Sequence, residues 1–285
     1  MQRYLKKILY GALALSALAA GVDFLIHHYD PTRVLYKRLK AADKYVYDEI
    51  APRFRQTDPD SLIAIQTRAD AADARTRLIA AIWGNRGFPR TAMPAAIEPG
   101  IDDPVLSALP NLARIERITV DMGNGVRSFA YHLQPAARRK NRLVIYHHGF
   151  AGTVRDVPDV LAAFLEQGYA VLAFNLMAYG GNSAHFRADD GQSFNLHFDL
   201  QKFASPLRYQ FEPVAVAINY MAKNYDYRSI DMIGFSAGGF VAAVAAALDP
   251  RIRRSYPVAG VYPIYLRSGQ DIQKGMASYY PPMLA

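Results

Sequence analysis

The chain has 285 residues, no cysteine and a formal net charge of +8, and 51% of its residues are hydrophobic. This length and apolar content are enough for one or two folded domains, and they exclude a disordered chain. Without cysteine, neither a disulfide framework nor a thiolate metal site can form. Part of the positive charge is concentrated in residues 138–142. We interpret that cluster as a solvated turn and expect no nucleic-acid partner, because no nucleic-acid-binding motif accompanies it.

Residues 1–26 have the layout of a secretory signal peptide. A basic segment precedes an uncharged apolar run from Ile8 to Val22, and Ala17 to Ala19 supply the small residues of a cleavage site. The run is short for a membrane span, but Phe24 to Ile26 extend it, so an uncleaved membrane anchor is an alternative. By the positive-inside rule, either one would place the rest of the chain on the extracytoplasmic side. A buried helix of a cytoplasmic protein is the remaining alternative.

Residues 27–113 read as an N-terminal helical segment followed by a linker. Pro31 to Ile50 place their apolar residues on one helical face. Asp58 before Pro59 is typical of a helix start, and this second helix is expected to end near Gly84. Residues 85–113 are rich in proline, glycine and alanine and are expected to be irregular.

From residue 114 to residue 285 the pattern is that of an α/β domain. Alternating segments at 115–122 and 126–133 flank Gly123-Asn124-Gly125, which predicts a hairpin. Continuous apolar runs follow at 143–148, 169–176, 229–235 and 255–266. Such runs are typical of parallel strands buried on both faces. Helical patterns lie between them, at 160–166 and from Pro213 onward, so we expect a mostly parallel sheet with flanking helices.

Ser236 lies in the sequence Gly-Phe-Ser-Ala-Gly, between an apolar strand and a strongly helical segment. Strand, serine and helix in that order form the setting of a nucleophile elbow. Gly234 and Gly238 would let the helix and the strand pass without a side-chain collision. The alternative is a glycine-rich turn in which the serine only caps the helix.

A second candidate element is His147-His148-Gly149-Phe150, at the end of an earlier strand. Acyl transfer needs backbone N–H groups that receive the developing negative charge on the carbonyl oxygen. We expect Phe150 and Ala237 to donate them, because one follows the turn after the strand and the other follows the serine. His148 and Gly149 are candidates for contact with the substrate. The two histidines are otherwise expected to pack and to order the loop.

These features resemble the α/β-hydrolase superfamily between Ile115 and Leu266, and more narrowly a group of bacterial esterases and dienelactone hydrolases. The stretches that carry the narrower resemblance are GYAVLAFNLMAYGGNS, FEPVAVAINYM, the elbow and ALDPRIRRSYPVAGVYPIYLR. The resemblance implies a small-molecule ester substrate, with Ser236 as nucleophile and Phe150 and Ala237 as the oxyanion hole. It implies no cofactor, and the sequence shows no metal-ligand spacing.

The superfamily places an acid and then a histidine after the serine, and here the chain departs from it. All seven histidines precede Ser236. Downstream, Asp249 is expected to be a turn residue. Asp271 follows the last apolar strand and is a candidate for the acid. His185 and His197 lie in a long polar loop and are alternative bases.

We therefore expect a hydrolase domain that is incomplete at its C-terminal end and lacks its last strands. Without a histidine after the nucleophile, the chain is expected to be weakly active or inactive. The alternative is a non-catalytic α/β-hydrolase-like protein, which would bind a ligand or act as a membrane-tethered partner module. Nothing in the sequence indicates the oligomeric state.

Overall fold

The computed structural model describes residues 2–28, 32, 35–36, 39, 58–137, 140–150, 152–196, 199–200 and 202–260. The chain divides into two compact units, Met1–Thr57 and Asp58–Ala285.

The first unit contains the helix α1 (Gln2–His28). Among the described helices, none has both the length and the apolar character that crossing a bilayer requires. Export or anchoring through residues 1–26 stays a prediction. The helix predicted at Pro31–Ile50 falls mostly on residues outside the described ones.

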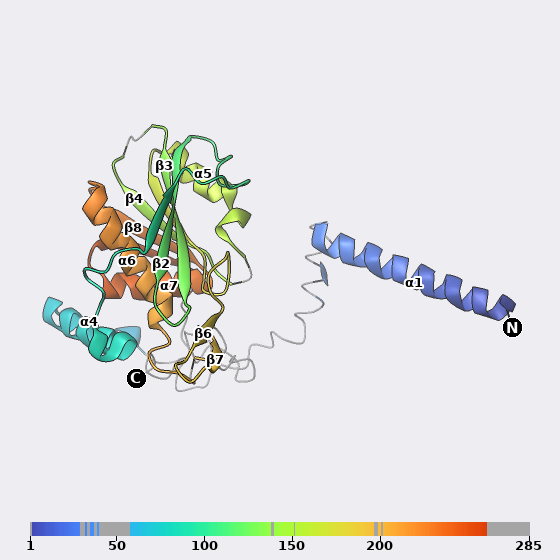
Figure 1. Ribbon diagram of the computed structural model, residues 1–285, viewed down its shortest axis with the longest axis horizontal. Coiled ribbons are helices and arrows are strands. Elements are labelled where there is room, and N and C mark those ends of the chain that lie inside the picture. The colour runs from blue at the N-terminus through green and yellow to red at the C-terminus, as the bar shows by residue number, and fades with distance from the viewer. Residues whose placement is uncertain are drawn as a thin grey trace. The chain divides into compact units, whose positions relative to one another are not determined.

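A mixed sheet, parallel from β5 to β9 and antiparallel from β1 to β5, forms the centre of the second unit (Figure 1). Its described strands run in the order β1-β2-β3-β5-β4-β8-β9. β4 pairs in parallel with β5 and β8, β8 pairs in parallel with β9, and the pairs β1–β2, β2–β3 and β3–β5 are antiparallel. The strands are β1 (Ala96–Pro99), β2 (Leu112–Asp121), β3 (Arg127–Pro135), β4 (Leu143–His147), β5 (Ala170–Phe174), β8 (Ile230–Phe235) and β9 (Ile252–Val258).

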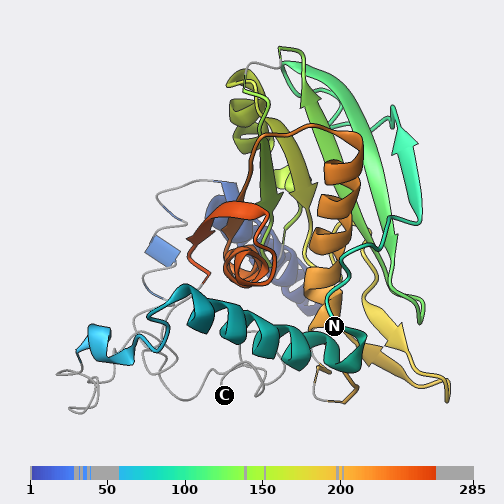
Figure 2. The same ribbon diagram turned by 90° about the vertical axis from the view of Figure 1, so that its left-hand side faces the viewer.

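Helices cover both faces of this sheet, as Figure 2 shows. One core contains residues of α4 (Arg68–Trp83), α6 (Arg208–Asn224) and α7 (Ala237–Leu248) together with inward residues of the strands. The other core contains α5 (Pro158–Glu166). β4 faces both, because Leu143 and Ile145 belong to the first core and Tyr146 to the second. Burial on both faces explains the continuous apolar strands and confirms the predicted fold class.

Shorter elements complete the unit. A small separate hairpin of β6 (His185–Arg187) and β7 (Ser193–Asn195) lies within the long polar loop after β5. Single 3₁₀ turns occur at η1 (Pro59–Leu62), η2 (Gly84–Arg86) and η3 (Val154–Asp156). The predicted β2–β3 hairpin is confirmed, and Asn124 at its turn adopts a left-handed φ of 54°.

The predicted helix from Asp58 to Gly84 is wrong at its beginning. Asp58 caps only η1, where its side chain accepts a hydrogen bond from the N–H of Asp60. The N-cap of the long helix α4 lies nine residues later, at Thr67, whose side chain accepts from the N–H of Asp70 while the Asp70 carboxylate accepts from the Thr67 N–H. This reciprocal capping box starts a separate helix. The predicted end is right, because Gly84 is the C-cap residue.

Two further expectations were wrong. Pro213 does not open α6, which begins at Arg208, so the proline lies inside the helix. The carbonyls of residues 205–207 accept hydrogen bonds from the N–H groups of residues 208–210, which starts the helix before the proline. The segment 85–113 is not wholly irregular, because it contains β1, which pairs with β2. β1 has only four residues, too few for a visible alternation.

Candidate active site

Ser236 occupies the sharp turn between β8 and α7, and its backbone is in an unusual conformation. Its φ is 55° and its ψ is −122°, a region that residues with a side chain rarely adopt. Three backbone hydrogen bonds hold it there. The Ser236 N–H donates to the carbonyl of Val258 at 2.8 Å, and the Ser236 carbonyl accepts from Gly239 at 2.8 Å and from Phe240 at 3.2 Å. The side chain is partly exposed at the carboxyl edge of the parallel strands.

Glycines allow the backbone to close around this turn. A Cβ on Gly234 would collide with the carbonyl of Gly238, and a Cβ on Gly238 would collide with the carbonyl of His147. A Cβ on Gly149 would lie 2.5 Å from the Phe235 carbonyl oxygen and 2.9 Å from the Ser236 Cβ. The loop after β4 therefore lies directly against the serine turn, as the two motifs together predicted.

The predicted oxyanion residues come from these two neighbouring segments. Ala237 is the first residue of α7, so its N–H has no carbonyl acceptor within its own helix. Phe150 follows Gly149, which touches the serine turn, and its side chain is 42% exposed. Both residues lie next to Ser236, but their assignment as oxyanion donors stays a prediction.

The two histidines at the end of β4 have partners on opposite faces of the sheet. The ring of His147 stacks on Phe174 with 5.9 Å between ring centroids, and its Nδ1 donates to the carbonyl of His148 at 2.9 Å. Burial lowers the pKa of His147 to about 4, so it is neutral at pH 7. His148 shares a hydrogen bond of 3.1 Å between its Nδ1 and the Tyr146 hydroxyl. Burial also lowers the pKa of His148, although the Asp156 carboxylate opposes that shift.

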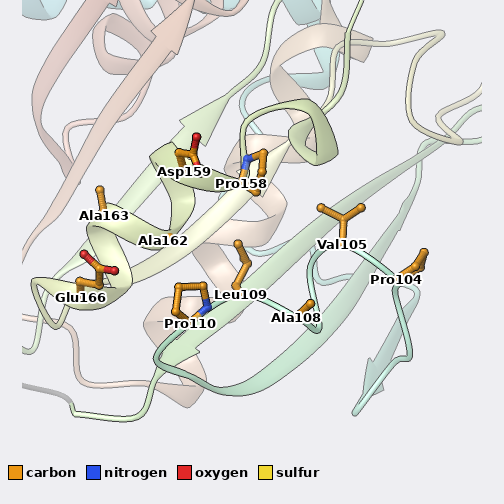
Figure 3. Close-up of a pocket in the computed structure, with 10 residues that line it drawn as sticks. All are labelled: Pro104, Val105, Ala108, Leu109, Pro110, Pro158, Asp159, Ala162, Ala163 and Glu166. Carbon is orange, nitrogen blue, oxygen red and sulfur yellow. The ribbon is translucent and has the colours of Figure 1, made fainter.

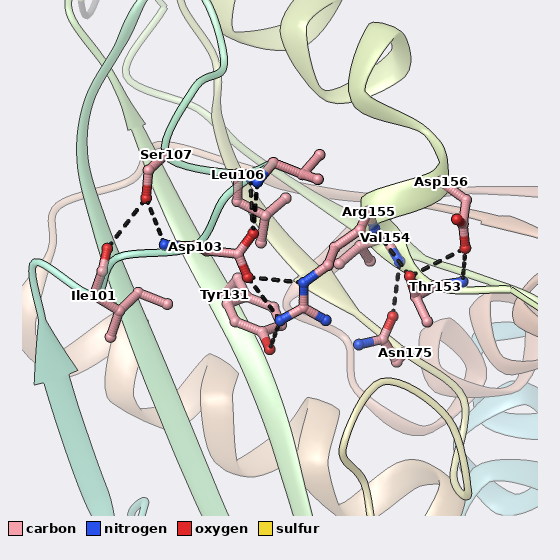
Figure 4. Close-up of polar contacts among 11 residues, drawn as sticks. Ile101, Asp103, Leu106, Ser107, Tyr131, Thr153, Val154, Arg155, Asp156 and Asn175 are labelled. Carbon is pink, nitrogen blue, oxygen red and sulfur yellow. Dashed lines mark hydrogen bonds and ion pairs between the residues drawn. The ribbon is translucent and has the colours of Figure 1, made fainter.

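Two anchors hold the segment that follows Phe150 (Figure 4). Arg155 donates from Nε to Asp103 at 2.8 Å and from Nη2 to the Tyr131 hydroxyl at 3.0 Å. Asn175, the residue after β5, accepts from the N–H of Val154 at 2.8 Å. These contacts tie the loop after β4 to a preceding turn and to the neighbouring strand.

Asp103 is 4% exposed and is ionised in this arrangement. Burial alone would raise the pKa of its carboxyl, but the hydrogen bonds from Arg155 and from the N–H groups of Leu106 and Val105 hold it below its usual range. The carboxylate therefore holds both the turn at 103–106 and Arg155 of the segment that follows Phe150.

The other candidates lie elsewhere. Asp271 and His197 fall outside the described residues. His185 is exposed on β6 of the small hairpin. Asp249 is the C-cap residue of α7 and its carboxylate accepts from the backbone and side chain of Arg251, so the prediction of a turn residue is confirmed.

A groove of about 550 Å³ lies away from the serine turn, between the segment 104–110 and α5 (Figure 3). Prolines and alanines make up most of its lining, and Asp159 and Glu166 are its acidic residues. No residue of the elbow or of the loop at 148–150 lines it. We therefore place the candidate chemistry at Ser236 and not in this groove.

Sequence reasoning missed Asp103, Arg155 and Tyr179 as parts of the site's surroundings. Tyr179 contacts Phe150 edge to face, with 5.3 Å between ring centroids. Asp103 and Arg155 are 52 residues apart, and no local pattern pairs them. The sequence shows only that Arg155 is a charged residue near a candidate loop. Charged residues are too common for this to identify Asp103 as its partner.

The comparisons with known proteins define the class. Residues 142–256 match the family model described as the alpha/beta hydrolase fold. These residues therefore have the α/β-hydrolase fold, and the resemblance inferred from the elbow and the strand order is confirmed at the level of the fold. No curated protein sequence matches the chain.

Three of the solved structures that resemble the chain are esterases by name. Methylesterase BT1017 is 15% identical with a TM-score of 0.58, over 79% of this chain and 48% of that one. Acetyl xylan esterase 1 from Thermoanaerobacterium sp. JW/SL YS485 is 20% identical with a TM-score of 0.45, over 65% of this chain and 56% of that one. A putative acetyl xylan esterase from Bacteroides fragilis NCTC 9343 is 19% identical with a TM-score of 0.48, over 70% of this chain and 53% of that one. The chain thus spans about half the length of these structures.

Proposed function

We propose that the protein is a serine hydrolase that cleaves esters of small molecules, with Ser236 as the nucleophile. The observation that carries the proposal is the conformation of Ser236. Its backbone is held at φ 55° by the end of β9 and by the first turn of α7. A strained turn is retained where the surrounding structure enforces it, and such turns cluster at active sites. The name of the similar methylesterase structure agrees with this reaction class.

In the proposed reaction, the Ser236 hydroxyl oxygen attacks the ester carbonyl carbon and forms a bond to it. The carbonyl oxygen becomes negatively charged and accepts hydrogen bonds from the N–H groups of Phe150 and Ala237. The ester C–O bond then breaks, and the alcohol leaves with the proton that Ser236 gave up. Water attacks the acyl-serine in the second half, which releases the carboxylic acid and restores the hydroxyl.

The proposal does not assign a general base. Among the described residues, the Nδ1 atoms of the two histidines at the end of β4 already have partners, because His147 Nδ1 bonds to a carbonyl and His148 Nδ1 to the Tyr146 hydroxyl. This favours weak turnover, and it also favours the second candidate function, a non-catalytic protein that binds a ligand at the same edge of the sheet.

A fluorophosphonate probe tests the proposal directly. The reagent forms a bond between phosphorus and an activated serine oxygen and releases fluoride. We expect stoichiometric labelling of Ser236, located by peptide mass spectrometry, and none in Ser236→Ala. Ser229→Ala is the matched control, since Ser229 is buried at the opposite end of β8 and should leave labelling intact.

Absence of labelling in a folded protein would contradict the serine hydrolase. Saturable binding of a small ester that survives in Ser236→Ala, without any labelling, would instead support the binding protein.

A further inference from the structure

The carboxyl edge of the sheet carries exposed aromatic side chains beside the candidate nucleophile. Phe174, His147 and Gly234 lie in register across β5, β4 and β8. The three loops that leave these positions are therefore neighbours, and they carry Tyr179, Phe150 and Ser236 in that order across the sheet. Phe150 lies between the tyrosine and the serine, and its side chain is 42% exposed.

Phe150 and Tyr179 form one contact pair, which we call the aromatic wall. Their ring centroids are 5.3 Å apart and their planes meet at 68°, an edge-to-face arrangement. Such pairs are a favoured geometry of aromatic rings and can accept a third ring in the same way. Phe235, which precedes the serine, is 49% exposed and adds apolar surface at this edge.

The loop that carries Tyr179 is firmly held, so the wall is preorganised. The Tyr179 N–H donates to the Leu176 carbonyl at 3.1 Å, and the Tyr179 carbonyl accepts from the Asn182 N–H at 3.0 Å. The Asn182 side chain is buried and donates to the carbonyls of Asn175 and Leu176, while its oxygen accepts from the Phe129 N–H at 2.7 Å. A surface fixed before binding loses little entropy when it receives a ligand.

We propose that the aromatic wall binds the acyl group of the ester and that the site favours aromatic acyl groups over short alkyl ones. The proposal rests on the function assigned to Ser236. If the Phe150 N–H receives the carbonyl oxygen, the Phe150 ring lies next to the group attached to that carbonyl. The acyl group stays bound through both halves of the reaction, whereas the alcohol side must open for departure and for water. A rigid apolar surface next to the serine therefore fits the acyl group.

Two phosphonate esters with the same leaving group measure this preference without requiring turnover. Ethyl p-nitrophenyl benzylphosphonate and ethyl p-nitrophenyl methylphosphonate both form a phosphorus bond to the serine oxygen and release p-nitrophenolate. Each rate is divided by the rate of alkaline hydrolysis of the same reagent, which removes intrinsic reactivity. For the full chain, we expect the corrected rate to be about tenfold higher with the benzyl reagent.

Substitutions of Tyr179 test whether the aromatic wall causes the preference for the benzyl reagent. We expect Tyr179→Ala to lower the benzyl-to-methyl ratio about five- to tenfold and Tyr179→Phe to retain it. Tyr169→Ala is the matched control, because Tyr169 also makes an edge-to-face pair, with Phe164, but at the amino end of β5. It should leave the ratio unchanged.

The two labelling rates distinguish failure of the aromatic wall from failure of the serine hydrolase. Equal corrected rates with both reagents, or a ratio that Tyr179→Ala does not change, would overturn the aromatic wall and leave the serine hydrolase standing. Modification of Ser236 by neither reagent would overturn the proposed function, and the wall with it.

Discussion

His147 is a histidine that the fold keeps neutral. Its ring is 3% exposed and stacked on Phe174, and burial lowers its pKa to about 4. In the unfolded chain the same ring has a pKa of about 6.5. The unfolded state therefore binds a proton at a pH where the folded state does not. Stability must rise with pH between about 4 and 6.5, and it is lost as the pH falls through that window.

We expect acidification from pH 7 to pH 4 to cost about 3 kcal/mol of unfolding free energy through this one residue. The measurement is the urea midpoint across the window, compared with His147→Phe, which keeps a ring on Phe174 but cannot be protonated. The variant should have a flatter dependence of the urea midpoint on pH. Identical pH profiles for the protein and His147→Phe would refute the assignment.

Gly238 is a residue of the elbow that has no room for a side chain. A Cβ there would collide with the carbonyl of His147, which is backbone and moves only with β4. We expect Gly238→Ala to destabilise the protein by about 1–3 kcal/mol despite the higher helix propensity of alanine. Thermal denaturation measures the effect, and Ala247→Ser at an exposed position of the same helix is the comparison. Unchanged stability would mean that α7 does not pack against β4 at this point.

At the scale of the elements, the link between Arg155 and Asp103 joins the loop after β4 to the turn at 103–106. Removing the Arg155 guanidinium leaves the nearly buried Asp103 carboxylate with fewer hydrogen-bond donors. We expect Arg155→Met to cost about 1–2 kcal/mol, less than for a fully buried pair because Arg155 is partly solvated. Because the folded-state pKa of Asp103 is lowered, this contribution is present above about pH 4 and is lost as the pH falls through the folded-state value.

Arg117→Met is the matched control for that loss. Arg117 and Glu98 form an ion pair that is 38% and 43% exposed, so removing the arginine should cost well under about 1 kcal/mol. Urea unfolding at pH 7 and pH 3 compares the two variants. Fluorophosphonate labelling of Ser236 should also slow in Arg155→Met and not in Arg117→Met. Equal losses in both variants would rule out a special role for Arg155.

The sequence predicted the parts of this site that local pattern determines. The apolar run before Ser236 and the alanine-rich helix after it are each visible within a dozen residues, and so is the glycine-rich end of β4. The N-cap of α4 at Thr67 was missed because an earlier Asp-Pro pair is an equally good start signal. The pairing of Phe150 with Tyr179 was not predictable, since strand order decides which loops become neighbours.

At the scale of the whole second unit, α4 belongs to the same core as the sheet. Its Ile82 and Trp83 are buried with residues of α6 and α7, and the Trp83 Nε1 donates to Glu212 of α6 at 3.1 Å. Trp83 is the only tryptophan of the chain. Its fluorescence therefore reports on the docking of a helix that precedes the sheet in sequence.

We expect the urea transition of Trp83 emission to coincide with the loss of far-UV circular dichroism, because one shared core unfolds cooperatively. Trp83→Phe fills the site with another ring, and it should retain the circular dichroism transition while removing the emission signal. An emission change at clearly lower urea would instead mean that residues before the sheet form a separate folding unit.

The hydrogen bond from Ser236 to Val258 has a consequence for the order of events during synthesis. The serine turn is held by the last residue of β9, which leaves the ribosome after the turn itself. We therefore expect Ser236 to be unreactive on a nascent chain until β9 has paired with β8. Stalled ribosomal complexes that expose the chain only to Leu248 should resist the fluorophosphonate, and those that expose it through Gly260 should react. Labelling of the shorter chain would show that the turn forms without its neighbour.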